Sequence, residues 1–341
     1  MRVTIRDVAS RAGFSITTVS LVLNNRNANI PQKTRDIILD AAKELGYRPN
    51  QLAVSLITKK TNVLGLIIPD IANSFFAEIT KQVDLEANRH GYTIIIGETF
   101  NNIKKYNELL QMYVDRQVDG IVVTNSTRLS VADELKNIDF LKKHGIPSMS
   151  IDSSIERSDV NSILVDQKLG GYVATKHLLE LGHRVIGCMT GPFGVTTSDE
   201  RVAGYKKALA EYGISFRPEL LFEGDYSMAR SKDALDHFLK LHCSAVFALN
   251  DMMAFGIYRS AYQRNINIPE ELSVVGFDDV NIADIVSPGL TTVRQPIDAI
   301  AVNAIEILNY MIENKNEQQV GKRVYLEPTL IVRESTASKN R

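Results

Sequence analysis

Apolar residues recur every three to four positions in three short stretches at the beginning of the chain. The first stretch follows a capping signal, Thr4-x-x-Asp7, and reaches a helix-ending glycine at Gly13. Its apolar stripe consists of Ile5, Val8, Ala9 and Ala12. This spacing predicts a short helix with one buried face.

Two further helices are predicted between residues 15 and 46. Ser15 can cap the second helix, and Pro31 stands where the first residue of the third helix would be. The second buried stripe is Ile16, Val19, Leu23 and in part Val22, and the third is Ile37, Ile38, Ala41, Ala42 and Leu45 before Gly46. Three short helices with a tight turn between the first two predict a helix-turn-helix unit.

The hydrophobic pattern changes at residue 63. Short apolar runs then alternate with helix-length amphipathic stretches; the runs are 63–68, 93–96, 120–123, 185–189, 245–249 and 272–275. This alternation predicts an α/β fold with doubly wound parallel sheets. Because about 270 residues exceed one comfortable core, we expect two lobes that face each other across a cleft.

The predicted organisation is therefore a headpiece, a linker and a core. The helix-turn-helix headpiece covers residues 1–48, a hinge and polar linker cover 49–62, and the core covers 63–341. Within the core we expect one lobe at about 63–163 and 295–324 and another at about 164–293 and 325–335.

Charge supports this division. The first 60 residues carry ten Lys and Arg against four Asp and Glu, whereas the remaining chain carries 29 against 36. A basic module on an acidic body is typical of a headpiece that binds a polyanion, because neutralised phosphates release counterions.

Other sequence features limit the function classes. The N-terminus lacks the apolar segment of a signal peptide, and no run of about 18 apolar residues could span a membrane, so we expect a cytoplasmic protein without membrane partners. Cys188 and Cys243 lie in apolar stretches without metal-ligand spacing, which predicts buried thiols and no metal site.

The sequence does not favour an enzyme. The motifs GxGxxG after the first strand, GxxxxGK[ST], HExxH and GxSxG are absent, so we expect no cofactor and no catalytic residues. The paired acids Asp278 and Asp279 are more often helix caps or polar ligand contacts than catalysts.

The second helix would enter the major groove of DNA. Thr17 and Leu21 face away from its apolar stripe, and Thr18 and Ser20 flank them. Hydroxyl groups can bind base edges or phosphates, whereas a leucine can only pack, for example against a thymine methyl.

The chain resembles the LacI/GalR family of transcriptional regulators. The headpiece stretch TIRDVASRAGFSITTVSLVLNN and IPQKTRDIILDAAKELGYRPN carries the resemblance, which continues in LGLIIPDIANSFFAEI, HLLELGHRVIG, ERVAGYKKAL, FALNDMMAFG and IPEELSVVGFDD. It implies a hinge helix, a periplasmic-binding-protein-like core with an effector between its lobes, and a homodimer on a pseudo-palindromic operator in double-stranded DNA.

The resemblance also implies which residues meet the operator. The hinge would run from Pro49 to Leu56 and form a helix only on DNA, with Leu56 wedged into the minor groove. Alternatively, Leu56 is an ordinary linker residue that packs on the core. The expected DNA contacts are Thr4, Ser15, Ile16, Thr17, Thr18, Ser20, Leu21, Asn24, Asn50, Ala53 and Leu56.

Ile16 and Leu21 depart from the family pattern, which often has polar, basic or aromatic side chains at these positions. Neither residue can read the O6 and N7 acceptors of guanine. We therefore expect apolar contacts that favour A·T pairs by about 1 kcal/mol each.

Matching family motifs implies an effector site of eight residues. They are Asn73, Phe75, Asp152, Arg201, Tyr226, Asn250, Asp278 and Gln295. An arginine, two acids and amides around aromatic rings suit a polyhydroxylated ligand, either a sugar or a nucleoside. The run 169–192 is similar to ribose-type and purine-type repressors, and the polar set favours ribose or a related sugar.

Several alternatives stay open at this point. One is a purine- or nucleoside-responsive repressor, and another is a catabolite-control regulator with a phosphorylated carrier protein as co-regulator. A solute-binding transport protein would share the core but not the basic headpiece. We expect effector binding to change the angle between the lobes and thereby the hinge spacing, with either sign. The C-terminus has no leucine heptads, which favours a dimer over a coiled-coil tetramer.

Overall fold

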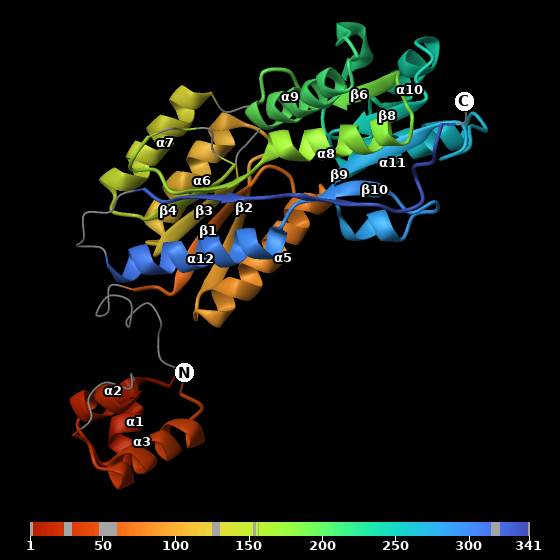
Figure 1. Cartoon of the computed structure of the whole chain (residues 1–341). Coiled ribbons are helices and arrows are strands. Elements are labelled where there is room, and N and C mark those ends of the chain that lie inside the picture. Colours follow the sequence, from red (N-terminus) through yellow and green to blue (C-terminus); the bar gives the residue numbers. More distant parts are fainter. Residues whose placement is uncertain are drawn as a thin grey trace. The chain divides into compact units, whose positions relative to one another are not determined.

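The structure is a computed structural model that describes residues 3–23, 29–47, 60–124, 130–152, 155, 157–314 and 321–339. The chain divides into two compact units, residues 1–61 and 62–341. Figure 1 shows the elements of each unit.

The first unit is the predicted three-helix headpiece. Its helices are α1 (Ile5–Ala12), α2 (Ile16–Leu23) and α3 (Gln32–Glu44). The amide and hydroxyl of Thr4 both donate to the Asp7 carboxylate at 2.8 Å, and these bonds lower the pKa of Asp7. Gly13 ends α1 with a φ of 74°, a left-handed conformation that glycine adopts without strain.

The apolar stripes of the headpiece were predicted with some errors. Ile16 is 45% exposed and Ile37 is 41% exposed, so neither belongs to the buried core. Val22, which was expected to be only partly buried, is 5% exposed. Pro31 is the N-cap residue of α3 and not its first helical residue. The helices are only 8 to 13 residues long, so they bury a narrower stripe than the apolar pattern suggested.

The second unit contains two six-stranded sheets. The first sheet has the order β11-β5-β4-β3-β1-β2, and all its strand pairs are parallel. Its strands are β1 (Val63–Ile68), β2 (Thr93–Glu98), β3 (Gly120–Thr124), β4 (Ser148–Ile151), β5 (Ser162–Val165) and β11 (Arg323–Leu326). This confirms the predicted parallel α/β architecture.

The second sheet has the order β12-β10-β9-β8-β6-β7 and is parallel except for the pair of β10 and β12. Its strands are β6 (Ile186–Thr190), β7 (Leu221–Glu223), β8 (Ala245–Ala248), β9 (Ser273–Asp278), β10 (Thr291–Arg294) and β12 (Thr329–Ile331). The predicted lobe boundaries stay a prediction; β5 and β11 each extend two residues beyond them.

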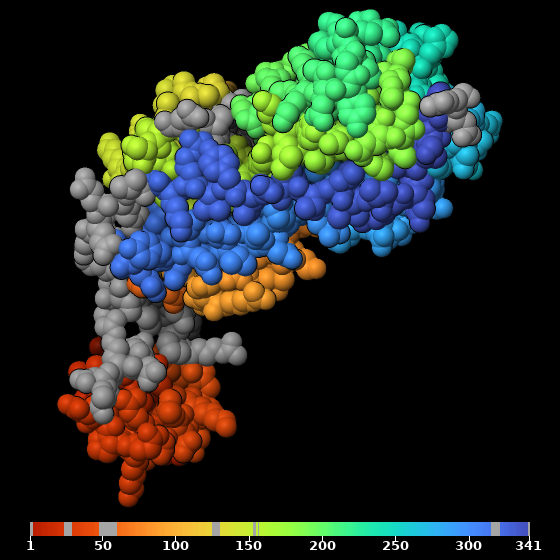
Figure 2. All heavy atoms as spheres, viewed as in Figure 1, coloured from red at the N-terminus to blue at the C-terminus, as the bar shows by residue number. Residues whose placement is uncertain are grey.

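Helices connect the strands and cover the sheets. They are α5 (Ser74–Arg89), α6 (Ile103–Asp115), α7 (Val131–Lys143), α8 (Gln167–Glu180), α9 (Thr196–Glu211), α10 (Ser231–Lys240), α11 (Asp251–Tyr262) and α12 (Ile297–Glu313), with the 3-10 turns η1 (Pro218–Leu220) and η2 (Asn281–Asp284). The chain passes between the sheets through α8, before α12, and between β11 and β12. Figure 2 shows the C-terminal part in dark blue lying along both lobes.

Helices α8 and α9 pack so closely that side chains are excluded at their crossing. A Cβ atom on Gly171 would lie 2.1 Å from the Arg201 carbonyl oxygen, and one on Gly204 would lie 2.1 Å from that of Lys168. The two glycines therefore fix the position of the α9 backbone that carries Arg201.

Cys188 and Cys243 are free, buried thiols as predicted, and burial raises the pKa of both. Within the described ranges, no helix combines the length and apolar character needed to cross a bilayer.

Candidate functional site

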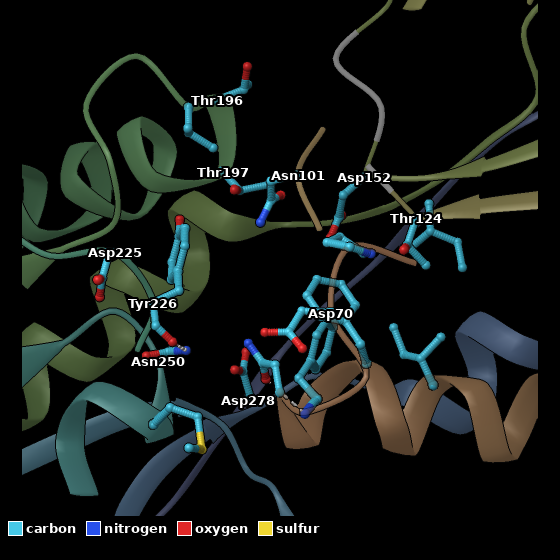
Figure 3. Close-up of a pocket in the computed structure, with 18 of the residues that line it drawn as sticks. Asp70, Asn101, Thr124, Asp152, Thr196, Thr197, Asp225, Tyr226, Asn250 and Asp278 are labelled. Atoms are coloured by element: carbon cyan, nitrogen blue, oxygen red, sulfur yellow. Dashed lines mark hydrogen bonds between the residues drawn. The ribbon is translucent and has the colours of Figure 1, made fainter. Parts of the chain in front are cut away.

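A cavity of about 450 Å³ lies between the two sheets, at the ends of their parallel strands. Its walls come from the ends of strands and the segments that follow them, at β1, β2, β3 and β4 of the first sheet and at β6, β7, β8 and β9 of the second. Seven of the eight predicted effector residues line it, as Figure 3 shows for several: Asn73, Phe75, Asp152, Arg201, Tyr226, Asn250 and Asp278. The structure therefore brings together residues that are up to 205 positions apart in the sequence.

Arg201 is the central cation of the cavity and is only 5% exposed. Its Nε donates to Gln167 Oε1 at 2.8 Å, and its Nη1 donates to the carbonyl oxygen of Leu249. The guanidinium carbon lies 3.6 Å from the centre of the Phe277 ring. The two hydrogen bonds hold the edge of the planar guanidinium, and the Phe277 ring covers its face. The group is therefore fixed in one orientation before a ligand binds.

Gln167 connects Arg201 to the first sheet, and the sequence analysis did not identify it. Its Nε2 donates to Asp152 Oδ2 at 3.3 Å, while Asp152 Oδ1 accepts from the Val165 amide at 3.2 Å. Gln167 is 1% exposed. Burial raises the pKa of Asp152, and the charge of Arg201 opposes this effect. The sequence feature that could have identified Gln167 is its position directly after Asp166, the N-cap residue of α8.

Two asparagines of the cavity also cap helices. Asn73 Oδ1 accepts from the Phe75 amide at 3.1 Å at the start of α5. Asn250 Oδ1 accepts from the Met253 amide at 3.0 Å at the start of α11, and its Nδ2 donates to the Tyr226 carbonyl oxygen at 3.0 Å. The caps fix both amides in place, so the cavity edge is rigid.

Tyr226 has a left-handed backbone with a φ of 62°. Its ring lies against Gly191, where a Cβ atom would be 2.2 Å from the ring. Burial raises the pKa of Tyr226, and the charge of Arg201 and the nearby Thr197 and Ser198 hydroxyl groups oppose this effect.

Asp278 and Gln295 form a pair at the end of β9. Gln295 Nε2 donates to Asp278 Oδ1 at 2.7 Å. Gln295 itself does not line the cavity, unlike the other seven predicted residues, and it borders a separate polar hollow. Gln295 is therefore connected to the cavity by its hydrogen bond to Asp278.

A second buried carboxyl, Asp251, lies near Asp278 and was missed by the sequence analysis. It accepts hydrogen bonds from the Thr292 hydroxyl at 2.5 Å and the Val280 amide at 2.9 Å. Burial raises the pKa of Asp278 to about 7, against the opposing charge of Arg201. Burial and the Asp278 charge raise the pKa of Asp251 as well. Burial therefore favours a state in which at least one of the Asp251 and Asp278 carboxyl groups carries a proton.

The predicted DNA contacts of the headpiece lie on or next to α1 and α2. Ser15 caps α2, because its Oγ accepts from the Thr18 amide at 3.1 Å, and the two hydroxyl oxygens are 2.8 Å apart. Ile16 and Thr17 are exposed, whereas Thr18, Ser20 and Leu21 are half-buried, and Thr4 caps α1. Asn24, Asn50, Ala53 and Leu56 lie outside the described residues.

Two family models match the chain. The model described as bacterial regulatory proteins, lacI family, matches residues 4–50. The model described as periplasmic binding protein-like domain matches residues 175–336.

Known proteins are similar over most or all of the chain. A curated relative from Vibrio campbellii, HTH-type transcriptional repressor PurR, is 34% identical over 341 residues and covers 99% of each chain. The solved structure of a LacI family transcriptional regulator from Enterococcus faecium with bound ribose is 27% identical, with a TM-score of 0.73, and covers 82% of this chain and all of its own. The Lac repressor dimer bound to operator and the anti-inducer ONPF is 24% identical, with a TM-score of 0.87 over 99% of this chain and all of its own, a likeness of fold.

Proposed function

The chain belongs to the LacI family of bacterial regulatory proteins, and we propose that its affinity for an operator is controlled by a small sugar bound between the two sheets. It is a DNA-binding transcriptional regulator with a helix-turn-helix headpiece and a ligand-binding core. Beyond this family membership, we propose that the effector is a sugar, that it binds between the two sheets, and that its binding changes the affinity for the operator. The effector is sensed, not chemically converted.

The cavity is the observation that carries this proposal. Arg201, Asp278 and Asn250 present charged and amide groups to it from the second sheet, and Asp152 and Asn73 do so from the first. A ligand hydroxyl both donates and accepts, so a polyhydroxylated molecule can satisfy donors and acceptors on both walls at once. Such a ligand bridges the two lobes.

Ribose or a related sugar is the proposed effector. Aromatic rings of Phe75, Phe76 and Tyr226 line the cavity and can cover the apolar faces of a sugar ring. The similar regulator from Enterococcus faecium was solved with ribose. A purine or nucleoside is the second candidate, because the same rings could stack on a base.

Communication with the operator is proposed to pass through the contacts that join the lobes. Asp152, Gln167 and Arg201 form one chain of hydrogen bonds from the end of β4 to α9. On the other side, the Asn281 amide donates to Glu78 Oε1 at 2.7 Å. A ligand that strengthens or breaks these contacts changes the angle between the lobes, and with it the state of the hinge at 49–62.

We also propose a homodimer. The core exposes large apolar side chains on α5, on and after the edge strand β2, and on and after η2; they include Leu85, Ile96, Phe100, Ile282 and Ile285. Apolar surface of this kind is suited to a subunit interface. Two headpieces would then contact two half-sites of double-stranded operator DNA. A phosphorylated carrier protein as co-regulator is the alternative partner.

A thermal-shift screen of sugars, purines and nucleosides with the full chain tests the effector. A cleft ligand raises the melting temperature by mass action. We expect a pentose or hexose to do so in the parent chain and in Asp298→Asn, an exposed change outside the cavity, but not in Asn250→Ala. A purine as the only stabilising ligand would contradict the sugar proposal.

A DNA shift assay tests the operator side. The full chain is expected to bind its selected operator with a strong salt dependence, and residues 62–341 alone are expected to lose this binding. DNA affinity that survives removal of the headpiece would contradict the assignment of residues 1–61.

A further inference from the structure

The charges that line the cavity are strongly unequal. Among the described lining residues there are five carboxyl side chains and one basic group, Arg201. The carboxyl residues are Asp70, Glu134, Asp152, Asp225 and Asp278. Ionised carboxylates on both walls of the cavity repel an anionic ligand.

The charge of Arg201 is already engaged. It opposes the raised pKa values of Asp152 and Asp278, and its Nε and Nη1 donate to Gln167 and Leu249. Moving the guanidinium onto a phosphate would remove the one cation that favours the ionised forms of the buried Asp152 and Asp278. Arg201 is therefore poorly placed to compensate a second anion.

Asp70 and Asp225 stand on opposite walls of the cavity. Asp70 follows β1 of the first sheet, and its Oδ1 accepts from the Ala72 amide at 2.8 Å. Asp225 follows β7 of the second sheet, and its Oδ1 accepts from the amide and hydroxyl of Ser227 at 3.0 and 2.8 Å. Neither forms an ion pair with a Lys or Arg in the described part of the chain. Figure 3 shows both among the lining residues.

Helix N-termini at the cavity oppose this charge only in part. Helices α5, α7, α9 and α11 begin there, and each end carries a partial charge of about +0.5. Asn73 and Asn250 already accept amide hydrogen bonds at two of these ends. Each of these partial charges is smaller than the full charge of an ionised carboxylate.

We propose that Asp70 and Asp225 act as a charge filter that excludes phosphorylated and carboxylated ligands, so that the effector is an uncharged polyhydroxylated molecule. This inference rests on the proposed function only in placing the effector in this cavity. It separates a free sugar from its sugar phosphate, and a nucleoside from its nucleotide. Asp70 and Asp225 are then specificity residues, distinct from those that hold the ligand.

The potential in the cavity can be measured without knowing the effector. Ala72 is exposed and lines the cavity, and the native thiols Cys188 and Cys243 are buried, so Ala72→Cys places one accessible thiol there. Its reaction rates with cationic 2-aminoethyl and anionic 2-sulfonatoethyl methanethiosulfonate are each divided by the rate with free cysteine. Met252→Cys, at a half-buried lining residue, provides a second position.

We expect the cationic reagent to react at least tenfold faster than the anionic one at both positions. Adding Asp70→Asn or Asp225→Asn should reduce this ratio about fivefold each, because one carboxylate affects the two reagents in opposite directions. Asp298→Asn removes the same charge outside the cavity and should leave the ratio unchanged. The Asp225→Asn variant is decisive at Ala72→Cys, since the two residues follow strands of different sheets.

A ratio near that of free cysteine, or one that the two Asn variants do not change, would overturn the charge filter. So would an effector whose phosphorylated derivative raises the melting temperature more than the parent sugar. These outcomes are separable from failure of the proposed function, because the thiol rates require neither an effector nor an operator. Conversely, a cation-selective cavity in a chain whose operator affinity no sugar alters would support the filter and refute the regulation.

Discussion

Asp278 ends β9 in a buried position, where it lines the cavity, accepts a hydrogen bond from Gln295 and raises the pKa of the buried Asp251 through its charge. A buried carboxyl group near other acids favours its protonated form. The usual aspartate value near 3.8 applies to the unfolded chain, whereas burial raises the pKa of Asp278 to about 7 in the folded one. Between these values, the folded chain holds a proton that the unfolded chain lacks, so this group's contribution to stability falls as pH rises.

Asp278→Asn removes this titration but keeps an oxygen that can accept from Gln295. We expect the free energy of unfolding of the variant, measured relative to that of the parent, to rise as the pH is raised from 5 to 8. Urea unfolding at a series of pH values measures it. The exposed change Asp298→Asn should give a flat difference, and an equally flat one for Asp278→Asn would contradict a raised pKa.

Arg201 tests the geometry of the site apart from its charge. Arg201→Lys retains one positive charge but loses the planar group over Phe277 and the fixed pair of hydrogen bonds. We expect effector affinity to fall at least tenfold, with calorimetry as the measurement. Lys232→Arg, at an exposed position near the start of α10, is the control for exchanging lysine and arginine outside the cavity and should leave effector affinity unchanged. Unchanged affinity in Arg201→Lys would mean that only the charge matters.

Individual site residues were predictable to different degrees. Strand ends and family motifs identified Asn73, Asp152 and Asn250, because loops after parallel strands meet at one edge of a sheet. Gln167 was missed because its partners lie 15 and 34 positions away and meet only after the sheets assemble. Gln295 was placed in the cavity, yet it acts through Asp278.

At the scale of elements, helix α9 is positioned by a glycine. Gly204→Ala puts a methyl group against the Lys168 carbonyl oxygen on α8, which is rigid backbone. We expect a loss of about 3 kcal/mol in stability and weaker effector binding, because α9 must move with Arg201. Chemical denaturation and calorimetry measure the two effects. Ala210→Ser on the exposed face of α9 should change neither, and a neutral Gly204→Ala would contradict the close packing.

Helix α2 carries the expected specificity for DNA. Ile16 is exposed and Leu21 half-buried, and neither side chain can bind guanine through hydrogen bonds. Selection of bound sequences by the full chain is expected to return A·T pairs opposite them, and Leu21→Arg is expected to shift that position towards guanine. An obligatory guanine opposite Leu21 in the parent chain would refute this.

The fold of these elements was largely predictable from periodicity. The six apolar runs all coincide with strands, because buried parallel strands give continuous apolar sequence. The strands β4, β5, β7, β10, β11 and β12 coincide with none of these runs, since each has only three or four residues and so short a segment carries no clear pattern. Burial of Val22 and exposure of Ile16 likewise depend on tertiary packing.

At the scale of the whole molecule, Gln167 is the proposed connection between the lobes. Gln167→Leu keeps its volume but breaks the hydrogen bonds to Asp152 and Arg201. We expect the effector to bind more weakly and, in addition, the factor by which saturating effector changes operator affinity to fall at least fivefold. A purely structural role would lower stability without changing that factor, and Gln167→Glu, which still accepts from Arg201, should restore part of it.

The central claim is that effector binding in the cavity changes the affinity of the chain for its operator. The direct measurement is the equilibrium affinity of the full chain for its selected operator, by fluorescence anisotropy, with and without the sugar found in the melting screen. We predict a change of about 5- to 150-fold in the parent chain and in Asp298→Asn, and none in Asn250→Ala at the same sugar concentration. Equal operator affinity with and without saturating sugar in the parent chain would contradict the account.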